Sequence, residues 1–318
     1  MKKCTIITSI HEENEVIKKL LEFENDLIIV GDLKSPIQYS NCIYLDIEFQ
    51  NNLSYKFSKL LSYNHYSRKN IGYLYAILND YDFIYDTDDD NFPLFSNDIE
   101  FKFNKLLTSD TLMINIYSLF TDQHIWSRGY PHSKINDISQ FNISENYKKA
   151  SIVYGLCDGD TDVDAVYRII SIKKDIKFSG EPLLIDNKKL IVFNSQSTFW
   201  LDKDVFLCLY LPTTVSSRFS DILRSFVTQY ILKSLDKNIG VYSEISYQKR
   251  NKHNNFDDLQ EEMFMYRKLD ELINILEKVN FCENKKDTFY NIYKSLQSNY
   301  IVDKKELFSV ELWLKIIK

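Results

Sequence analysis

Residues 86 to 90 place four carboxylates in five positions, directly after the β-branched and aromatic segment of residues 82–85. Adjacent like charges repel one another unless a cation neutralises them, and a hard divalent cation with oxygen ligands does so best. Such a site could hold Mg²⁺ or Mn²⁺, which could bridge the two phosphates of a nucleotide-sugar and act as a Lewis acid for the departing diphosphate. The alternative is a solvated acidic turn. The strand-like segment before the carboxylates and Asn91-Phe92-Pro93 after them favour the metal site.

A second acidic segment carries carboxylates at alternate positions from Asp158 to Asp164. Counted from Asp158, its sixth residue is Val163 instead of glycine and its twelfth is Ile169 instead of glutamate, so the segment is not an EF-hand loop. Two interpretations stay equal. The carboxylates could accept hydrogen bonds from sugar hydroxyls, or they could lie at a helix N-terminus, where negative charge is favoured.

Two permanent cations, Arg68 and Lys69, lie with His65 at an expected helix start. Cations at a helix N-terminus oppose the helix dipole, which favours a functional contact with an anion. The anion could be a diphosphate or the carboxylates of residues 86–90. The alternative is an ordinary surface helix with basic residues.

Two further residues have both a simple and a functional interpretation. Asp221 lies in the first turn of an expected helix, where the dipole favours a carboxylate and where the side chain could also act in catalysis. His253 lies in a basic loop, and a single loop histidine is more often solvated than a ligand.

Composition and motif spacing exclude several classes of protein. The seven glycines have the spacing of neither G-x-G-x-x-G nor G-x-x-x-x-G-K-[ST], so the Rossmann and P-loop phosphate fingerprints are absent. The five cysteines are dispersed and lack C-x-x-C, which argues against a disulfide framework and a structural zinc site. G-x-S-x-G and H-E-x-x-H are absent too, so serine-hydrolase and zincin chemistry have no support. The net charge of −6 argues against nonspecific nucleic-acid binding.

No segment has the character of a membrane span or a signal peptide. The longest stretch without a charged residue, residues 205–217, has 13 residues, whereas a span requires roughly 20 apolar residues. The first apolar run, residues 4–10, is too short for a signal peptide and contains Thr8 and Ser9. We therefore expect a soluble cytoplasmic protein, with peripheral association at the inner face of the membrane as an open alternative.

The first 90 residues alternate short β-branched runs with helix-length segments. Strands are expected at residues 5–10, 27–30, 42–45 and 82–85, and helices at residues 13–24 and 67–78. Such alternation predicts an α/β fold with a parallel sheet, whose ligand site lies at the carboxyl ends of the strands. Asp32 and residues 86–90 follow such strand ends.

The rest of the chain is less regular. Strands are expected at residues 112–117, 190–194 and 205–211, followed by a strong amphipathic helix over residues 216–235. The tail is expected to be helical from about residue 255. We therefore predict a main domain over residues 1–254 and a C-terminal helical extension over residues 255–318.

Taken together, eight segments in one order resemble the STELLO family of glycosyltransferases over most of residues 4–262. They comprise residues 30–36, 63–77, 84–93, 126–131, 158–169, 193–200, 209–226 and 248–254. A weaker resemblance links the chain to the reversibly glycosylated polypeptides, which are UDP-arabinopyranose mutases. It rests on Asp88-Asp89-Asp90, Gly129-Tyr130-Pro131 and Arg218-Phe219-Ser220-Asp221-Ile222. The arginine that becomes glycosylated in that family is absent, since Ser133 is followed by Lys134 and Ile135.

The STELLO resemblance implies a GT-A type fold, a Rossmann-like sheet that binds a nucleotide-sugar without a glycine fingerprint. It also implies a DxD metal motif for Mn²⁺ or Mg²⁺, with Asp88 and Asp90 as metal ligands and His253 as a third metal or diphosphate contact. The expected donor-binding residues, with a UDP-sugar favoured, are Thr8, Asp32, Lys34, Asp88 and Arg128. The expected acceptor- or sugar-binding residues are Asp162, Asp164 and Arg218.

The leading hypothesis is a metal-dependent glycosyltransferase that acts on a surface glycan or glycolipid of the capsule or lipopolysaccharide type. Arg68 and Lys69 would offset the charge of the leaving diphosphate. Asp221 would be the general base if the enzyme inverts configuration, and would orient the acceptor if it retains configuration. The alternatives are a nucleotide-sugar mutase and a non-catalytic scaffold of a glycan-synthesis complex. The plant STELLO proteins carry a membrane anchor, and since we expect no anchor in this sequence, we do not expect a Golgi role to transfer.

Overall fold

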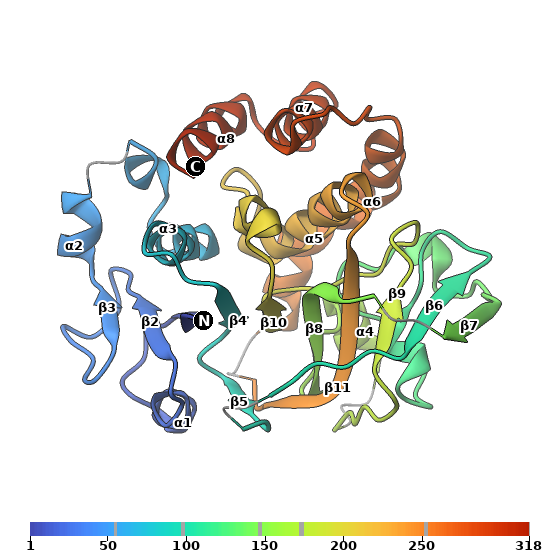
Figure 1. The fold of residues 1–318 in the computed structure, drawn as a ribbon, viewed down its shortest axis with the longest axis horizontal. Helices are drawn as coiled ribbons and strands as arrows, with labels where there is room; N and C mark the ends of the chain where they lie inside the picture. The colour runs from blue at the N-terminus through green and yellow to red at the C-terminus, as the bar shows by residue number, and fades with distance from the viewer. Residues whose placement is uncertain (54–55, 97–98, 146–147, 172–174, 251–253, 318) are drawn as a thin grey trace.

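The computed structural model describes residues 1–318 except 54–55, 97–98, 146–147, 172–174, 251–253 and 318. An eleven-stranded mixed sheet forms its centre, in the order β3-β2-β1-β4-β10-β8-β11-β9-β6-β7, with β5 paired to β11. Figure 1 shows α3 and α5 along one side of the sheet, α7 and α8 beyond them, and α1 on the opposite side.

The N-terminal part of the sheet is parallel. It contains β1 (Lys3–Thr8), β2 (Asp26–Val30), β3 (Ile43–Leu45) and β4 (Phe83–Thr87), which pair in the order β3-β2-β1-β4. These four strands confirm the four that the sequence predicts, with boundaries that differ by at most two residues. Side chains alternate between the two faces, as a strand requires: Ile6 and Ile28 belong to the core on one face, Ile7 and Ile29 to the core on the other.

One antiparallel strand joins this part of the sheet to the rest. β10 (Ser197–Trp200) pairs with β4 on one side and with β8 (Ala150–Gly159) on the other. β11 (Asn238–Gln248) then runs parallel to β8. The remaining strands are β5 (Asn91–Pro93), β6 (Lys105–Ser109), β7 (Phe141–Glu145) and β9 (Leu183–Ile185).

Eight α-helices and five short 3-10 helices complete the described chain. The α-helices are α1 (Glu15–Leu21), α2 (Ile47–Asn52), α3 (Asn70–Leu78), α4 (Ala165–Ile170), α5 (Ser217–Ser234), α6 (Asn255–Glu277), α7 (Lys285–Ser298) and α8 (Lys304–Ile316). The 3-10 helices are η1 (Ser58–Leu60), η2 (Tyr66–Lys69), η3 (Ile116–Leu119), η4 (His132–Lys134) and η5 (Lys203–Leu209). The α/β class with a helical C-terminal extension is therefore confirmed, while the boundary between two domains stays a prediction.

Several predicted elements are wrong in type or boundary. The segment 205–211 lies mostly in η5, whose N-cap Asp202 accepts a hydrogen bond from the Asp204 backbone N–H. The segments 112–117 and 190–194 form no strand and share one isolated bridge between Met113 and Leu190. These runs are short and buried, and apolar runs of this length do not distinguish a strand from other buried segments. The helix expected from residue 67 begins as η2, capped by His65 instead of Ser67.

Candidate functional site

The acidic segment lies where β4 ends, beside the carboxyl end of the parallel strand β1. Its first carboxylate, Asp86, is fully buried and does not face solvent. Asp86 forms ion pairs of 2.7 Å with Lys69 and of 2.7 Å with Arg224, and accepts a hydrogen bond from the Tyr73 hydroxyl at 2.8 Å. Asp86 is thus a structural residue, and Asp88, Asp89 and Asp90 are the three carboxylates that line a cavity.

Each of the three cavity-lining carboxylates has a fixed neighbour, and that of Asp89 is the Ser9 hydroxyl, which donates to it at 2.5 Å. Asp88 accepts hydrogen bonds from the Tyr66 hydroxyl at 2.7 Å and from the Lys69 ammonium at 3.3 Å. Asp90 accepts a hydrogen bond from the Gln248 amide at 3.0 Å. Burial, opposed by Lys69 and reinforced by the charge of Asp90, raises the pKa of Asp88 to about 7. Burial also raises the pKa values of Asp89 and Asp90.

Burial is the main cause of these raised pKa values, and a divalent cation with oxygen ligands would offset the cost of ionising the buried carboxylates. Within the described ranges, no three His, Cys, Asp or Glu side chains come together as a preformed metal site. His253, the expected third contact, lies outside the described residues. Asp88 and Asp90 could therefore hold a cation only together with further ligands.

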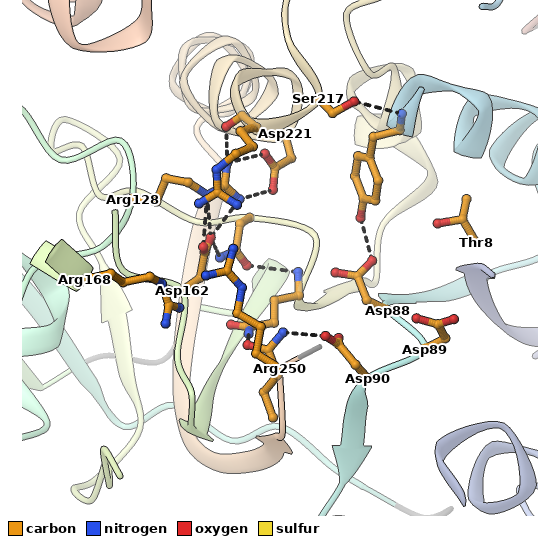
Figure 2. Close-up of a pocket in the computed structure, with 15 residues that line it drawn as sticks. Thr8, Asp88, Asp89, Asp90, Arg128, Asp162, Arg168, Ser217, Asp221 and Arg250 are labelled. Carbon is orange, nitrogen blue, oxygen red and sulfur yellow. Dashed lines mark hydrogen bonds and ion pairs between the residues drawn. The ribbon is translucent and has the colours of Figure 1, made fainter. Parts of the chain in front are cut away.

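Arg128 lines this cavity, which has a volume of about 280 Å³. Its guanidinium forms two hydrogen bonds of 3.0 Å to Asp221 and bonds of 2.9 and 2.8 Å to Asp162. Figure 2 shows Arg128 pointing between these two carboxylates, with Asp88, Asp89 and Asp90 across the cavity. Although burial opposes the charge, Asp162 and Asp221 raise the pKa of Arg128 well above its ordinary value.

Asp162 has further hydrogen-bond partners besides the Arg128 guanidinium. Its carboxylate accepts a 2.6 Å hydrogen bond from the Asn194 side chain, and its backbone oxygen accepts one from the Arg128 backbone N–H. Burial favours the neutral acid, but the charge and hydrogen bonds of Arg128, and then the charges of Arg218 and Arg168, outweigh it and lower the pKa of Asp162. Asp162 therefore presents an ionised carboxylate to the cavity.

Asp164, also expected to bind sugar, has a different position. It is fully buried, caps α4 through a bond from the Tyr167 backbone N–H at 2.7 Å, and accepts bonds from Trp126 and His132. The structure does not bring Asp164 into the cavity lining. The helix-cap interpretation of this residue thus agrees with the contacts, because both carboxylate oxygens have partners within the protein.

A second cavity, of about 460 Å³, adjoins the first. Residues at the ends of β1 and β2 line it, including the predicted donor contacts Thr8, Asp32 and Lys34. Asp32 accepts a 2.7 Å hydrogen bond from the backbone N–H of Asn64. Both cavities are lined by Thr8, Tyr66, Asp89 and Ser217, so they form adjacent compartments of one cleft.

The two cations predicted to act together lie apart. Lys69 is fully buried behind the acidic segment, where it pairs with Asp86 and Asp88. Arg68 lines the second cavity and donates to the Leu61 carbonyl at 3.1 Å and to the Gln50 side chain. The sequence left a diphosphate and the carboxylates of residues 86–90 as possible partners of Arg68 and Lys69. In the structure, the partner of Lys69 is the carboxylate segment.

The remaining predicted residues and several unpredicted ones meet in the first cavity. Arg218 and Asp221 both line it. The unpredicted lining residues are Tyr66, Arg168, Asn194, Gln196, Ser217, Gln248 and Arg250. All of them belong to the eight segments that resemble the STELLO family, which is the signal that could have identified them.

The structure thus defines an α/β protein with a two-compartment cleft at the carboxyl ends of parallel strands, the usual position of a ligand site in such sheets. No family profile matches the chain. Sequence comparison finds similarity to two Arabidopsis thaliana proteins. One is named "Probable glycosyltransferase STELLO2", 25% identical over 272 residues, which are 76% of this chain and 35% of that protein. The other is named "Probable glycosyltransferase STELLO1", 26% identical over 270 residues, which are 76% of this chain and 34% of that protein.

These two matches confirm the resemblance to the STELLO family. The mixed sheet with C-terminal helices is compatible with the Rossmann-like fold of a glycosyltransferase. The chain spans about a third of the length of these relatives. Among the described helices, none combines the length and apolar character that crossing a membrane requires.

Proposed function

We propose that the protein is a metal-dependent glycosyltransferase that moves a sugar from a nucleotide-diphosphate donor to a glycan or glycolipid acceptor. The observation that carries the proposal is the pair of adjoining cavities, with Asp89 lining both of them and Asp88 and Asp90 lining the first. A donor that spans both compartments would place its nucleoside in one, its diphosphate at the carboxylates and its sugar in the other. The similarity to proteins named as probable glycosyltransferases supports the same reaction class.

The second cavity is the proposed nucleoside site, with a UDP-sugar as the favoured donor. Asp32 offers a carboxylate at the end of β2 that would accept hydrogen bonds from nucleoside hydroxyls or from the base. The Asn64 backbone N–H holds this carboxylate, and Asn64 itself adopts a positive φ of 52°. The loop between η1 and η2 thus orients the proposed nucleoside contact.

Asp88 and Asp90 would hold Mn²⁺ or Mg²⁺ together with the donor phosphates, and His253 would add a third contact. A bound cation would neutralise charge on the departing diphosphate. Lys69 acts from behind the carboxylates, because its ammonium fixes Asp88 and reduces the repulsion within the segment. Arg68 faces the nucleoside cavity, so we assign it to that compartment.

Arg128, Asp162 and Asp221 form the proposed sugar-binding centre. Arg128 donates to both oxygens of Asp221, and the backbone N–H groups of Ile222 and Ser195 donate to one oxygen each, so the four lone-pair sites of that carboxylate all have donors. We therefore favour Asp221 as the residue that orients the sugar or acceptor over Asp221 as the general base. For the acceptor we propose a surface glycan of the capsule or lipopolysaccharide type.

A thermal-shift series with nucleoside diphosphates, with and without Mn²⁺, tests the proposal. UDP at 100 times its dissociation constant should stabilise the protein by about 2.7 kcal/mol when Mn²⁺ is present. Asp90→Asn should remove the Mn²⁺-dependent part of this stabilisation, because it removes one ligand charge.

The matched control is Asp137→Asn, which makes the same change at an exposed position outside both cavities. It should keep the full stabilisation. If no nucleoside diphosphate stabilises the protein under any condition, the scaffold hypothesis is favoured instead. If donor alone yields a ring-isomerised sugar, the mutase hypothesis is favoured.

A further inference from the structure

Three arginines, Arg168, Arg218 and Arg250, line the first cavity and form what we call the arginine cluster. They come from α4, from the start of α5 and from the chain just after β11. Figure 2 shows Arg168 at the end of the cavity opposite Thr8, and Arg250 between Arg168 and Asp90. The arginine cluster therefore lies in the same cavity as the proposed sugar-binding centre, next to it.

Each arginine of the cluster has a carboxylate partner that does not line the cavity. Arg168 donates to Asp160 at 2.9 Å, Arg250 donates to Asp258 at 2.7 Å, and Arg218 pairs with Glu262. The three arginines line the cavity, whereas Asp160, Asp258 and Glu262 are absent from its lining. The cavity wall at this end is therefore cationic although each guanidinium has a neighbouring carboxylate.

Helix α6 fixes two of the three arginines. Glu262 is fully buried and also accepts hydrogen bonds from the Ala165 backbone N–H at 2.9 Å and from the Tyr266 hydroxyl. Asp258, one turn earlier in α6, contacts Arg218 at 3.6 Å in addition to Arg250. The guanidiniums are thus held in place before any ligand arrives, which lowers the entropy cost of binding.

The arginine cluster has an unused hydrogen-bond donor, and its positive charges repel one another. The buried Nε of Arg168 has no hydrogen-bond partner in the described part of the chain. Burial, and then the like charges of Arg168 and Arg218, lower the pKa of Arg250. An anion placed among the three guanidiniums would relieve this repulsion and accept bidentate hydrogen bonds.

We propose that the arginine cluster is a subsite for an anionic group, a phosphate or a carboxylate, on the acceptor. The proposal rests on the glycosyltransferase function given above. The donor enters from the nucleoside cavity, which adjoins the first cavity at Thr8 and Asp89, so its diphosphate lies at the acidic segment. The end lined by Arg168 is left for the acceptor, and its chemistry selects a negatively charged one.

Three small probes with the same sugar ring test this subsite: glucose 6-phosphate, glucuronate and neutral glucose. Their affinities are measured by calorimetry on the whole protein, with UDP and Mn²⁺ filling the donor site. We expect at least one anionic probe to bind about tenfold tighter than glucose, and its advantage to fall with added salt. A phosphate or a carboxylate preference identifies which anion the acceptor carries.

Arg168→Gln should remove the preference for the anionic probe without changing the stabilisation by UDP. Arg168→Lys, which keeps the charge, should retain part of the preference for the anionic probe. This variant distinguishes the effect of losing the charge from the effect of a folding defect. Arg267→Gln, which makes the same change at an exposed position of α6 outside the cavity lining, should leave the preference intact.

Equal affinities for the three probes would overturn the subsite, as would an anionic probe that binds only when UDP is absent, because it would then occupy the donor site. Stabilisation by UDP is measured on the same samples. Its loss would refute the proposed function, whereas normal UDP binding without anion preference would refute the acceptor subsite alone.

Discussion

Lys69 illustrates how a single buried cation supports the acidic segment. Its side chain is fully buried and its ammonium lies 2.7 Å from Asp86, 3.3 Å from Asp88 and within hydrogen-bond reach of the Thr87 carbonyl. Removal of one partner of a buried ion pair leaves an uncompensated charge, which costs about 3–5 kcal/mol. Lys69→Met should therefore reduce the free energy of unfolding by about that amount in urea titrations.

The surface pair of Lys19 and Glu22 provides the control, because both side chains are partly exposed. Lys19→Met should change the free energy of unfolding by less than about 1 kcal/mol. Similar effects of the two substitutions would contradict the structural role of Lys69.

The role of Asp221 is decided by kinetics. If it orients the sugar or acceptor through Arg128, Asp221→Asn should raise KM for the acceptor and lower kcat by less than about tenfold, whereas loss of a general base typically lowers the rate by about 10²–10⁴-fold. Release of nucleoside diphosphate, measured with the donor that the thermal-shift series identifies, reports both values. A fall in kcat of a hundredfold or more with unchanged KM would restore the base assignment.

Some residues of the site were predictable from the sequence because their chemistry is local. The consecutive carboxylates of residues 86–90 needed only their own spacing to suggest a cation site. The inward position of Asp86 was not predictable, because it depends on Arg224, which lies 138 residues further along the chain. The same holds for the arginine cluster, whose members come from three separate segments and whose carboxylate partners lie partly in α6.

At the scale of elements, the strands of the N-terminal sheet were predictable because buried β-branched runs alternate with helical segments there. The segment 205–211 was wrongly predicted as a strand. Its residues are apolar because they are buried, but most of them form the 3-10 helix η5, which packs against the C-terminal helices. The Leu207 carbonyl in this segment accepts a 3.0 Å hydrogen bond from the indole N–H of Trp313 in α8. That partner is over 100 residues away and sets the local conformation.

The C-terminal helices are bound to the sheet domain by the packing of this same tryptophan. Trp313 is fully buried, with ring centroids 5.7 Å from Phe57 and 5.5 Å from Tyr210. Trp313→Ala should reduce the free energy of unfolding by about 3–5 kcal/mol, through lost burial and the cavity that remains.

Phe308 is the matched control in α8, because it is 50% exposed. Phe308→Ala should change the free energy of unfolding by no more than about 0.5 kcal/mol. Equal effects of the two substitutions in urea titrations would show that α8 does not hold the core together.

At the scale of the whole molecule, the cleft spans both parts of the sheet. Thr8, Asp32 and Asp88 come from the parallel N-terminal part, whereas Arg128 lies between η3 and η4 and Asp162 follows β8. β10 pairs with β4 and β8 at once, and one continuous hydrophobic cluster includes Ile84 of β4, Ile152 of β8 and Trp313 of α8. The two parts of the sheet therefore depend on each other for stability.

This shared core predicts one cooperative unfolding transition for the whole chain in differential scanning calorimetry. A ligand that binds only the folded state raises its stability by mass action, so UDP with Mn²⁺ should move the entire transition upward. If the two parts of the sheet were independent, two transitions would appear, and UDP would move only the one that contains β1 and β4. A single transition that shifts with UDP concentration, together with the same shift when unfolding is followed by the fluorescence of Trp126, Trp200 and Trp313, would establish that donor binding stabilises both parts of the sheet together.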